Sequence, residues 1–188
     1  MSHKRKPLTE AEHLNLVVDG FNRVFLPTYR TKLKGGYDEP LYLPAKNASE
    51  YHQIQFSHDY VASALHEIAH WCVAGEKRRK QVDYGYWYAP DGRSERQQRE
   101  FEQVEVKPQA IEWLLSVAAG LPFRLSVDNL NGCARASDEF RLAVAGQARS
   151  YAASGLPSRA QSLAEFYAHR FGTDEVFKPG YYCERLLR

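Results

Sequence analysis

The chain has 188 residues, of which 44% are hydrophobic and 26% are charged, and its formal net charge at pH 7 is +2. This size and composition fit one globular domain over residues 1–188, with residues 1–8 frayed, and the charge indicates neither a nucleic-acid nor a membrane surface. No apolar run could span a membrane, the N-terminus lacks a signal peptide's hydrophobic segment, and three widely spaced cysteines make a poor disulfide framework. We therefore expect a cytoplasmic protein, and we take a monomer as the default, because the sequence does not indicate an oligomeric state.

The first part of the chain predicts one helix followed by a small sheet. Thr9 can cap a helix that we expect to end before Pro27, because proline cannot continue the helical hydrogen-bond pattern. Glycines and prolines then divide the stretch Thr31–Pro44 into turns and an extended run, and Tyr51–Phe56 has the pattern of a strand. These pieces predict a small β-sheet ahead of the next helix.

The stretch Asp59–Cys72 predicts a buried helix, because it is apolar nearly all round. We expect Ser57 to cap its start and Gly75 to follow its end. Its polar residues fall three or four positions apart and therefore form a single stripe: Asp59, Ser63, His66, Glu67 and His70. Buried polar groups that lack partners are costly, so the residues of this stripe have to be satisfied.

The stripe contains the pattern H-E-x-x-H, in which His66 and His70 project from one face of the helix. Imidazoles at this spacing can share one metal ion at the usual metal–nitrogen distance of about 2.0–2.1 Å. The alternative is two histidines that are hydrogen-bonded in a core or face solvent, since such a short pattern also occurs by chance. We favour a metal site, because an otherwise apolar helix offers the imidazoles few other partners.

A second long helix is predicted to begin after Ser94 and to end at Gly120 and Pro122, with a kink or restart near Lys107 because Pro108 follows. Beyond it, the pattern predicts shorter elements. They are a strand at Phe123–Val127 and helices at Asp138–Ala153 and Arg159–Phe171, with Ser158 and Gln161 as a capping box for the last helix. The sequence therefore predicts an α+β fold, a mostly helical single domain with a small β-sheet.

A third metal ligand is expected from the second long helix, which carries Glu102, Glu105 and Glu112. Its apolar face is predicted to centre on Val104, Ile111 and Leu115. Glu105 borders that face, Glu112 borders it two turns further along, and Glu102 points away from it. We predict Glu105 as the ligand, with Glu102 as the fallback, against the alternative that each glutamate is simply a solvated surface residue.

Two histidines and one carboxylate do not identify the metal. The same set serves zinc hydrolases and non-haem iron(II) oxygenases. In a zinc peptidase, Glu67 would be the general base that activates a metal-bound water. In an iron(II) oxygenase, the open positions would take O₂, and Glu67 would support the site without binding the metal. The spacing of the residues leaves both interpretations open.

An aromatic block follows the histidine helix at Tyr84, Tyr86 and Trp87. We predict that it forms a wall of a substrate cleft, where aromatic faces accept a cationic group, although core packing accounts for such a block equally well. Asp83 flanks the block and could hold an ammonium group. His58, eight residues before His66 and on a similar side of the predicted helix, is a candidate partner for the site.

Five ordered segments closely resemble the bacterial elongation factor P hydroxylases. They are D-E-P-L-Y-L-P at Asp38–Pro44, A-S-A-L-H-E-I-A-H-W-C at Ala62–Cys72, D-Y-G-Y-W-Y at Asp83–Tyr88, P-D-G-R at Pro90–Arg93 and F-E-Q-V-E-V-K-P-Q-A at Phe101–Ala110. This combination is far more specific than H-E-x-x-H alone. The resemblance covers the middle of the chain, and the two ends show only a general likeness.

The resemblance implies a small cytoplasmic enzyme that hydroxylates a lysine of translation elongation factor P, after that lysine has been extended with a β-lysyl group. It also implies a metal, expected to be Fe(II) with zinc as the alternative, and O₂ as the oxidant, outside the 2-oxoglutarate-dependent oxygenases. Carried over by motif, the metal ligands are His66, His70 and Glu105. The H-E-x-x-H helix packed on a glutamate-bearing helix also looks like a zincin core, which keeps a zinc-dependent peptidase as the alternative function.

Overall fold

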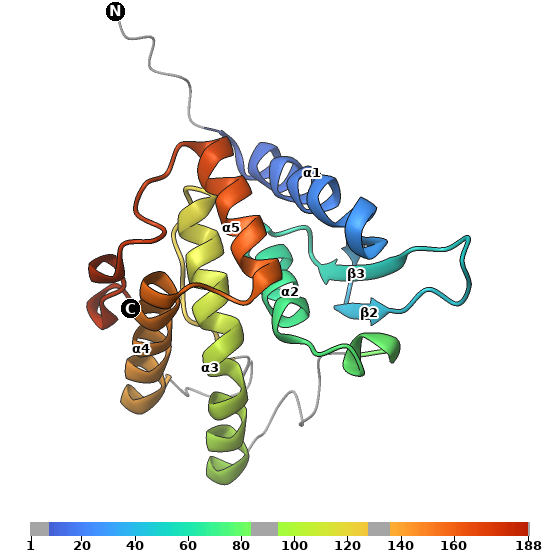
Figure 1. The fold of residues 1–188 in the computed structure, drawn as a ribbon. Coiled ribbons are helices and arrows are strands. Elements are labelled where there is room, and N and C mark those ends of the chain that lie inside the picture. The colour runs from blue at the N-terminus through green and yellow to red at the C-terminus, as the bar shows by residue number, and fades with distance from the viewer. Residues whose placement is uncertain (1–7, 84–93, 128–135, 188) are drawn as a thin grey trace, which may run out of the picture.

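The structure is a computed structural model that describes residues 8–83, 94–127 and 136–187. These residues form a mostly helical fold with one small sheet, as predicted (Figure 1). The helices are α1 (Glu10–Tyr29), α2 (Val61–Val73), α3 (Glu95–Ala118), α4 (Asp138–Ser154) and α5 (Ser158–Phe171), the strands are β1 (Thr31–Tyr37), β2 (Leu41–Leu43) and β3 (His52–Ser57), and the short 3₁₀ helices are η1 (Arg78–Lys80), η2 (Pro179–Tyr181) and η3 (Glu184–Leu186).

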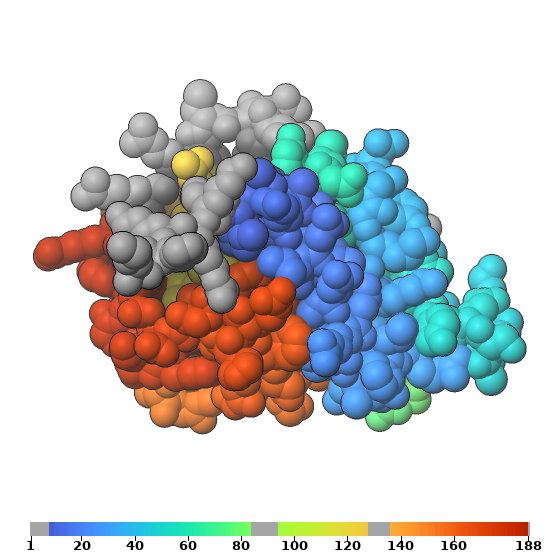
Figure 2. All heavy atoms as spheres, turned by 90° about the horizontal axis from the view of Figure 1, so that it is seen from above, coloured from blue at the N-terminus to red at the C-terminus, as the bar shows by residue number. Residues whose placement is uncertain are grey.

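The histidine helix α2 is the centre of the fold. It packs against α1, α3, α5 and β3, so it has neighbours on nearly every side. Its apolar side chains Leu65, Ile68 and Ala69 are at most 1% exposed, which explains why the sequence of α2 is apolar nearly all round. Seen from above, α1 lies beside both α5 and the strands and covers this part of the core (Figure 2). The neighbours of α2 therefore fix its position and rotation.

The sheet has the strand order β1-β3-β2, with β1 parallel and β2 antiparallel to β3. The pairing of β1 with β3 shifts between Lys34 and Tyr37, where the chain carries Gly35 and Gly36. A Cβ at Gly35 would lie 2.3 Å from Oδ1 of Asp59, and the same oxygen accepts a hydrogen bond from the Gly36 N–H at 2.7 Å. Only glycine therefore fits at position 35, and the Asp59 side chain stabilises this irregularity of the sheet through its hydrogen bond to Gly36.

The prediction that the central helix begins after Ser57 and includes Asp59 is wrong. Ser57 ends β3, and α2 begins at Val61 with Tyr60 as its N-cap. His58 and Asp59 have positive φ angles of 59° and 50°, so they turn the chain in the left-handed conformation before the helix starts. The polar stripe on the helix is therefore shorter than predicted, and His58 is exposed in this turn instead of lying on the helix with His66.

The prediction that the first helix ends before Pro27 is wrong, and the second long helix does not restart at Pro108. α1 continues through Pro27 and ends at Tyr29, and its C-cap Arg30 adopts the left-handed conformation at a φ of 50°. Pro27 lies in the last turn, where its missing N–H removes a single hydrogen bond. α3 continues through Pro108 as one helix from the predicted cap Ser94, and its buried neighbours on both sides of the proline hold it together.

Two predictions about the second half of the chain also need correction. Residues 123–127 form no strand. α5 begins at Ser158 with Pro157 as its N-cap, and Gln161 Oε1 accepts a hydrogen bond from the Leu156 N–H at 3.0 Å, so Ser158 forms no capping box. The helix predicted at Asp138–Ala153 is present as α4 with Ser137 as its cap.

Among the described residues, none of the helices combines the length and apolar character that crossing a membrane requires.

Candidate metal centre

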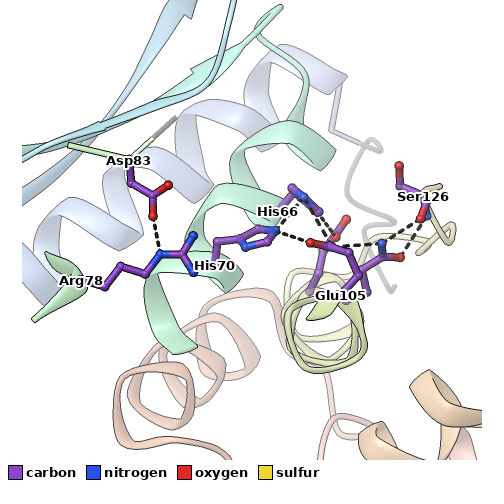
Figure 3. A network of polar contacts seen from close by, with 8 residues as sticks. His66, His70, Arg78, Asp83, Glu105 and Ser126 are labelled. Atoms are coloured by element: carbon purple, nitrogen blue, oxygen red, sulfur yellow. Dashed lines mark hydrogen bonds and ion pairs between the residues drawn. The ribbon is translucent and has the colours of Figure 1, made fainter. Parts of the chain in front are cut away.

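The two histidines of α2 face α3. Figure 3 shows Glu105 pointing from α3 toward His66 and His70, with Arg78 and Asp83 on the far side of His70. The Nε2 atoms of His66 and His70 are 3.0 Å apart, and His70 Nε2 is 3.2 Å from Oε1 of Glu105. His66 Nε2 is 4.0 Å from Oε2 of the same carboxylate. The structure therefore brings together one ligand atom from each of the three predicted ligands.

This arrangement fits a divalent metal ion. Donor atoms that bind one ion at about 2.0–2.2 Å, at octahedral to tetrahedral angles, lie roughly 3–3.5 Å apart. The separations of 3.0 Å between the two imidazoles and 3.2 Å between His70 and Glu105 match that spacing. Two imidazoles and a carboxylate are a donor set that both zinc and iron(II) accept.

The electrostatics of the cluster favour a positive charge at its centre. Burial alone would raise the pKa of the Glu105 carboxyl, but His70 and then His66 outweigh it and lower that pKa to about 2. Burial opposes a charge on His66, yet the carboxylates, led by Glu112 and including Glu105 and Glu67, raise the pKa of His66 well above 6.5. Because the carboxylates create a negative potential here, the site attracts either a proton on His66 or, in its place, a metal cation.

Arg159 of α5 fixes the end of α2 just beyond His70. Its Nη2 atom donates to the carbonyl oxygens of Trp71, Cys72 and Ala74 at 2.9, 3.0 and 2.6 Å, and its guanidinium lies 4.6 Å from the centre of the Trp71 ring. A cation at this position satisfies carbonyls that the last turn of a helix leaves unpaired. The turn that carries His70 is therefore held in place from outside the cluster of candidate metal ligands (His66, His70 and Glu105), which we call the metal cluster.

A cleft opens beside His70, between α2 and the edge of the sheet. Its lining mixes apolar and charged side chains: Tyr42, Ile54, Glu67, His70, Trp71, Ala74, Arg78, Arg79 and Asp83. Asp83 is paired with Arg78, and its backbone pairs with that of Tyr42 on strand β2 through hydrogen bonds of 2.7 and 3.1 Å. The cleft therefore lies next to the three predicted ligands. His70 belongs to both sites, and Glu67 of the same helix also lines the cleft.

Comparison with known proteins identifies the family. A sequence profile described as Elongation factor P hydroxylase matches residues 20–180. A Haemophilus influenzae protein named Elongation factor P lysine hydroxylase is 50% identical over 165 residues, which cover 87% of this chain and 93% of that protein. The chain belongs to the elongation factor P hydroxylase family. The resemblance found in the five sequence segments is confirmed, and in this hydroxylase-family chain the matched region contains both helices of the metal cluster.

The hydroxylase-family chain uses Glu102 differently from either prediction. Glu102 is 7% exposed and accepts hydrogen bonds from the backbone N–H and the hydroxyl of Ser137, at 3.2 and 2.6 Å. Val104, predicted to be central to the apolar face, is 57% exposed. The face was misplaced because α3 packs against α2, α4 and α5 and so buries more than one side. Glu102 joins α3 to the start of α4 and lies outside the metal cluster.

Sequence reasoning weighed Glu112 only as a possible metal ligand, and it did not single out Gln109. Oε2 of Glu112 lies 2.8 Å from Nδ1 of His66, on the side of the imidazole away from His70. Gln109 donates to Glu105 Oε2 at 3.2 Å and exchanges hydrogen bonds of 2.8 and 3.1 Å with the backbone of Ser126. Their spacing from Glu105, by four and seven residues, places all three on one face of α3, and this periodicity was the available signal.

The predicted substrate-binding residues fare unevenly in the structure. Asp83 lines the cleft, as described above. Tyr84, Tyr86 and Trp87 lie outside the described residues. His58 is exposed in the turn before α2, where its ring stacks on Tyr60 at a centroid distance of 6.2 Å.

Proposed function

We propose that this protein is a metal-dependent hydroxylase that adds one oxygen atom to a lysine side chain of elongation factor P. One observation carries the proposal: in a chain of this family, Nε2 of His66, Nε2 of His70 and a Glu105 oxygen gather within 4.8 Å of one another. His66, His70 and Glu105 would hold the metal, which we propose is iron(II), with zinc as the alternative. When bound, iron(II) held by two histidines and one carboxylate would keep positions open for O₂ and supply the oxidation chemistry. Overall, one oxygen atom of O₂ enters a C–H bond of the lysine, and the other leaves as water with two protons and two electrons from an external reductant.

The cleft beside His70 is proposed to take the substrate side chain. Its apolar walls at Tyr42, Ile54 and Trp71 suit the methylene chain of a lysine. Glu67 also lines it, one residue from His66 in the chain, and a carboxylate there would face the ammonium group of a lysine. Glu67 therefore acts on the substrate in this proposal and does not bind the metal. Asp83 would add a second carboxylate at the other end of the cleft.

The lysine is proposed to carry a β-lysyl extension when it reaches the cleft, so that hydroxylation completes its modification. We propose that Tyr84, Tyr86 and Trp87 contact this extended side chain, and that His58 contacts the protein substrate from its exposed turn. The enzyme is proposed to act in the cytoplasm as a monomer, on elongation factor P itself and without nucleic acid or membrane. The relatives that identify the family are named as hydroxylases, which argues against the zinc-peptidase alternative.

The test is the intact mass of elongation factor P that carries the β-lysyl lysine. After aerobic incubation with the iron(II)-loaded enzyme and ascorbate as the reductant, its mass should rise by that of one oxygen atom, and no rise should occur without O₂ or with His66→Ala. If no aerobic condition with iron(II) yields the rise, the proposal fails. Cleavage of elongation factor P that depends on zinc and Glu67 would favour the peptidase instead.

A further inference from the structure

A buried carboxylate stands directly behind one of the histidines. Oε2 of Glu112 lies 2.8 Å from Nδ1 of His66, and the Glu112 side chain is only 8% exposed. Nε2 of the same imidazole points the other way, toward His70 at 3.0 Å. Glu112 is not among the residues whose ligand atoms gather into the metal cluster. The imidazole therefore separates this carboxylate from the place where the metal would bind.

The chemistry of imidazole gives this arrangement a consequence. A neutral imidazole has one N–H and one nitrogen lone pair, and its hydrogen-bond partner decides which nitrogen carries the proton. A carboxylate at Nδ1 is an acceptor only, so the proton of His66 lies on Nδ1 and the lone pair lies on Nε2. Carboxylates in this position also orient the ring and make the other nitrogen a better ligand.

The sequence spacing couples this group to the metal ligand on α3. Glu105 and Glu112 are seven residues apart, close to two helical turns, so they lie on one face of α3. That face packs against α2. The packing of α2 against α3 therefore fixes the positions of both the proposed ligand Glu105 and the Glu112 carboxylate that contacts His66.

We propose that Glu112 is a positioning residue: it holds the ring of His66 in the tautomer and orientation that bind the metal, and it does not bind the metal itself. The inference rests on the metal site of the proposed function. It assigns Glu112 a role that H-E-x-x-H and the third ligand do not account for. Glu102 offers a matched control, because it is a buried glutamate of the same helix. As whole residues, Glu102 is 7% exposed and Glu112 is 6% exposed, but Glu102 bonds to Ser137 instead of to a predicted metal ligand.

The experiment measures the affinity of the full chain for Co(II) under anaerobic conditions, by competition with a chelator and by the visible spectrum of the bound ion. Glu112→Ala should bind Co(II) about 10- to 100-fold more weakly than the wild type and with an altered spectrum. Glu112→Gln keeps an acceptor for Nδ1–H and should recover most of the affinity and the wild-type spectrum. Glu102→Ala and Glu102→Gln should bind within about twofold of the wild type, whatever their effect on thermal stability.

Several results would overturn the inference. Wild-type affinity in Glu112→Ala would show that the carboxylate only fills space, and equal losses in Glu112→Ala and Glu112→Gln would exclude the orienting hydrogen bond. Complete loss of binding in both variants, as in His66→Ala, would make Glu112 a ligand. Equal losses in the Glu102 variants would point to general destabilisation. The assay contains no elongation factor P, so its result does not depend on the hydroxylation reaction. A wild type that binds no metal would refute both this inference and the proposed function.

Discussion

α2 presents its polar residues to two different surroundings. Toward α3, His66 contacts Glu112, His70 contacts Glu105, and Gln109 ties Glu105 to the backbone of Ser126. Toward the sheet, Glu67 and His70 line a cleft instead. A network of buried, mutually bonded groups holds its geometry, whereas a cleft leaves room for a ligand. We therefore propose that the metal binds on the α3 side of α2 and the substrate on the sheet side.

The largest effect is expected from removing the carboxylate at the centre of the α3 side. Glu105→Ala should weaken metal binding by more than about 100-fold, beyond the loss expected for a group that only orients a ligand. Hydroxylation should be lost with it. Metal content by atomic absorption and turnover by intact mass measure both.

Glu102→Ala is the control for Glu105, because it removes a buried glutamate three residues earlier on the same helix. It should retain metal and activity but lower the free energy of unfolding by about 1–3 kcal/mol, since Ser137 loses its hydrogen-bond partner. If Glu102→Ala lost the metal and Glu105→Ala kept it, the assignment of the third ligand would be reversed.

On the sheet side, Glu67→Gln should leave metal affinity within about threefold of the wild type and reduce kcat/KM by about tenfold, the effect of about 1.4 kcal/mol of lost substrate binding. The reason is that Glu67 lines the cleft and is not among the three residues whose ligand atoms gather beside α3. Steady-state kinetics with modified elongation factor P give this value. Glu76→Gln, an exposed glutamate just beyond α2 that pairs with Lys80 at 2.7 Å, should change neither quantity. A metal loss in Glu67→Gln as large as that in Glu105→Ala would remove the distinction between the two sides.

A smaller effect is expected from Gln109→Leu, which disconnects Glu105 from Ser126. Metal affinity should fall severalfold, less than in Glu112→Ala, and the free energy of unfolding should fall by about 1–3 kcal/mol because the backbone of Ser126 loses these bonds. Chelator competition and denaturant unfolding measure the two changes. Gln98→Leu, on the same helix and bonded to Glu102 at 3.4 Å, should leave metal affinity unchanged. Unchanged affinity in Gln109→Leu as well would show that Glu105 needs no such support.

The smallest effect concerns pH. The pKa of His66 in the folded, metal-free protein is raised well above 6.5, so protonated His66 stabilises the fold fully below about pH 6.5, and this stabilisation is lost as pH rises through the raised pKa. Metal requires the deprotonated imidazole, so the stabilisation by added zinc should grow over the same range. Thermal unfolding with chelator and with zinc follows both trends. In the metal-free protein, a His66→Ala variant should lack the first trend, and a wild type that gains stability as pH rises through this range would contradict the account.

The candidate site could be predicted from the sequence where helix periodicity determines which side chains share a face. It could not be predicted where the contacts depend on tertiary packing. H-E-x-x-H places two imidazoles on one helical face whatever surrounds them. Glu105, which borders the predicted apolar face and matches the family motif, does lie with them in the structure, although that face was centred wrongly on Val104. The ligand role itself stays a prediction. Glu112 and Gln109 could not be assigned their contacts from one sequence, because these contacts depend on how α2 and α3 pack and on where Ser126 lies.

The fold was predicted to a similar depth. The helix cap at Ser94 and the strand before α2 follow from local chemistry and are present. A kink or restart was expected near Lys107, and α3 does not restart there, because tertiary packing on both sides of Pro108 outweighs the lost hydrogen bond. The left-handed turn at His58 and Asp59 could not be foreseen, because Asp59 is stabilised there by the backbone of Gly36, far away in the sequence.

The central claim is that the α3 side of α2 holds one metal ion between His66, His70 and Glu105. A crystal of the protein purified without chelators, measured at the absorption edge of its metal, tests it directly. The account predicts one anomalous peak about 2.0–2.2 Å from Nε2 of both histidines and from a Glu105 oxygen, with Glu112 still bonded to Nδ1 of His66. A peak bound by Glu102 or by Glu112, or one on the cleft side of α2, would contradict it.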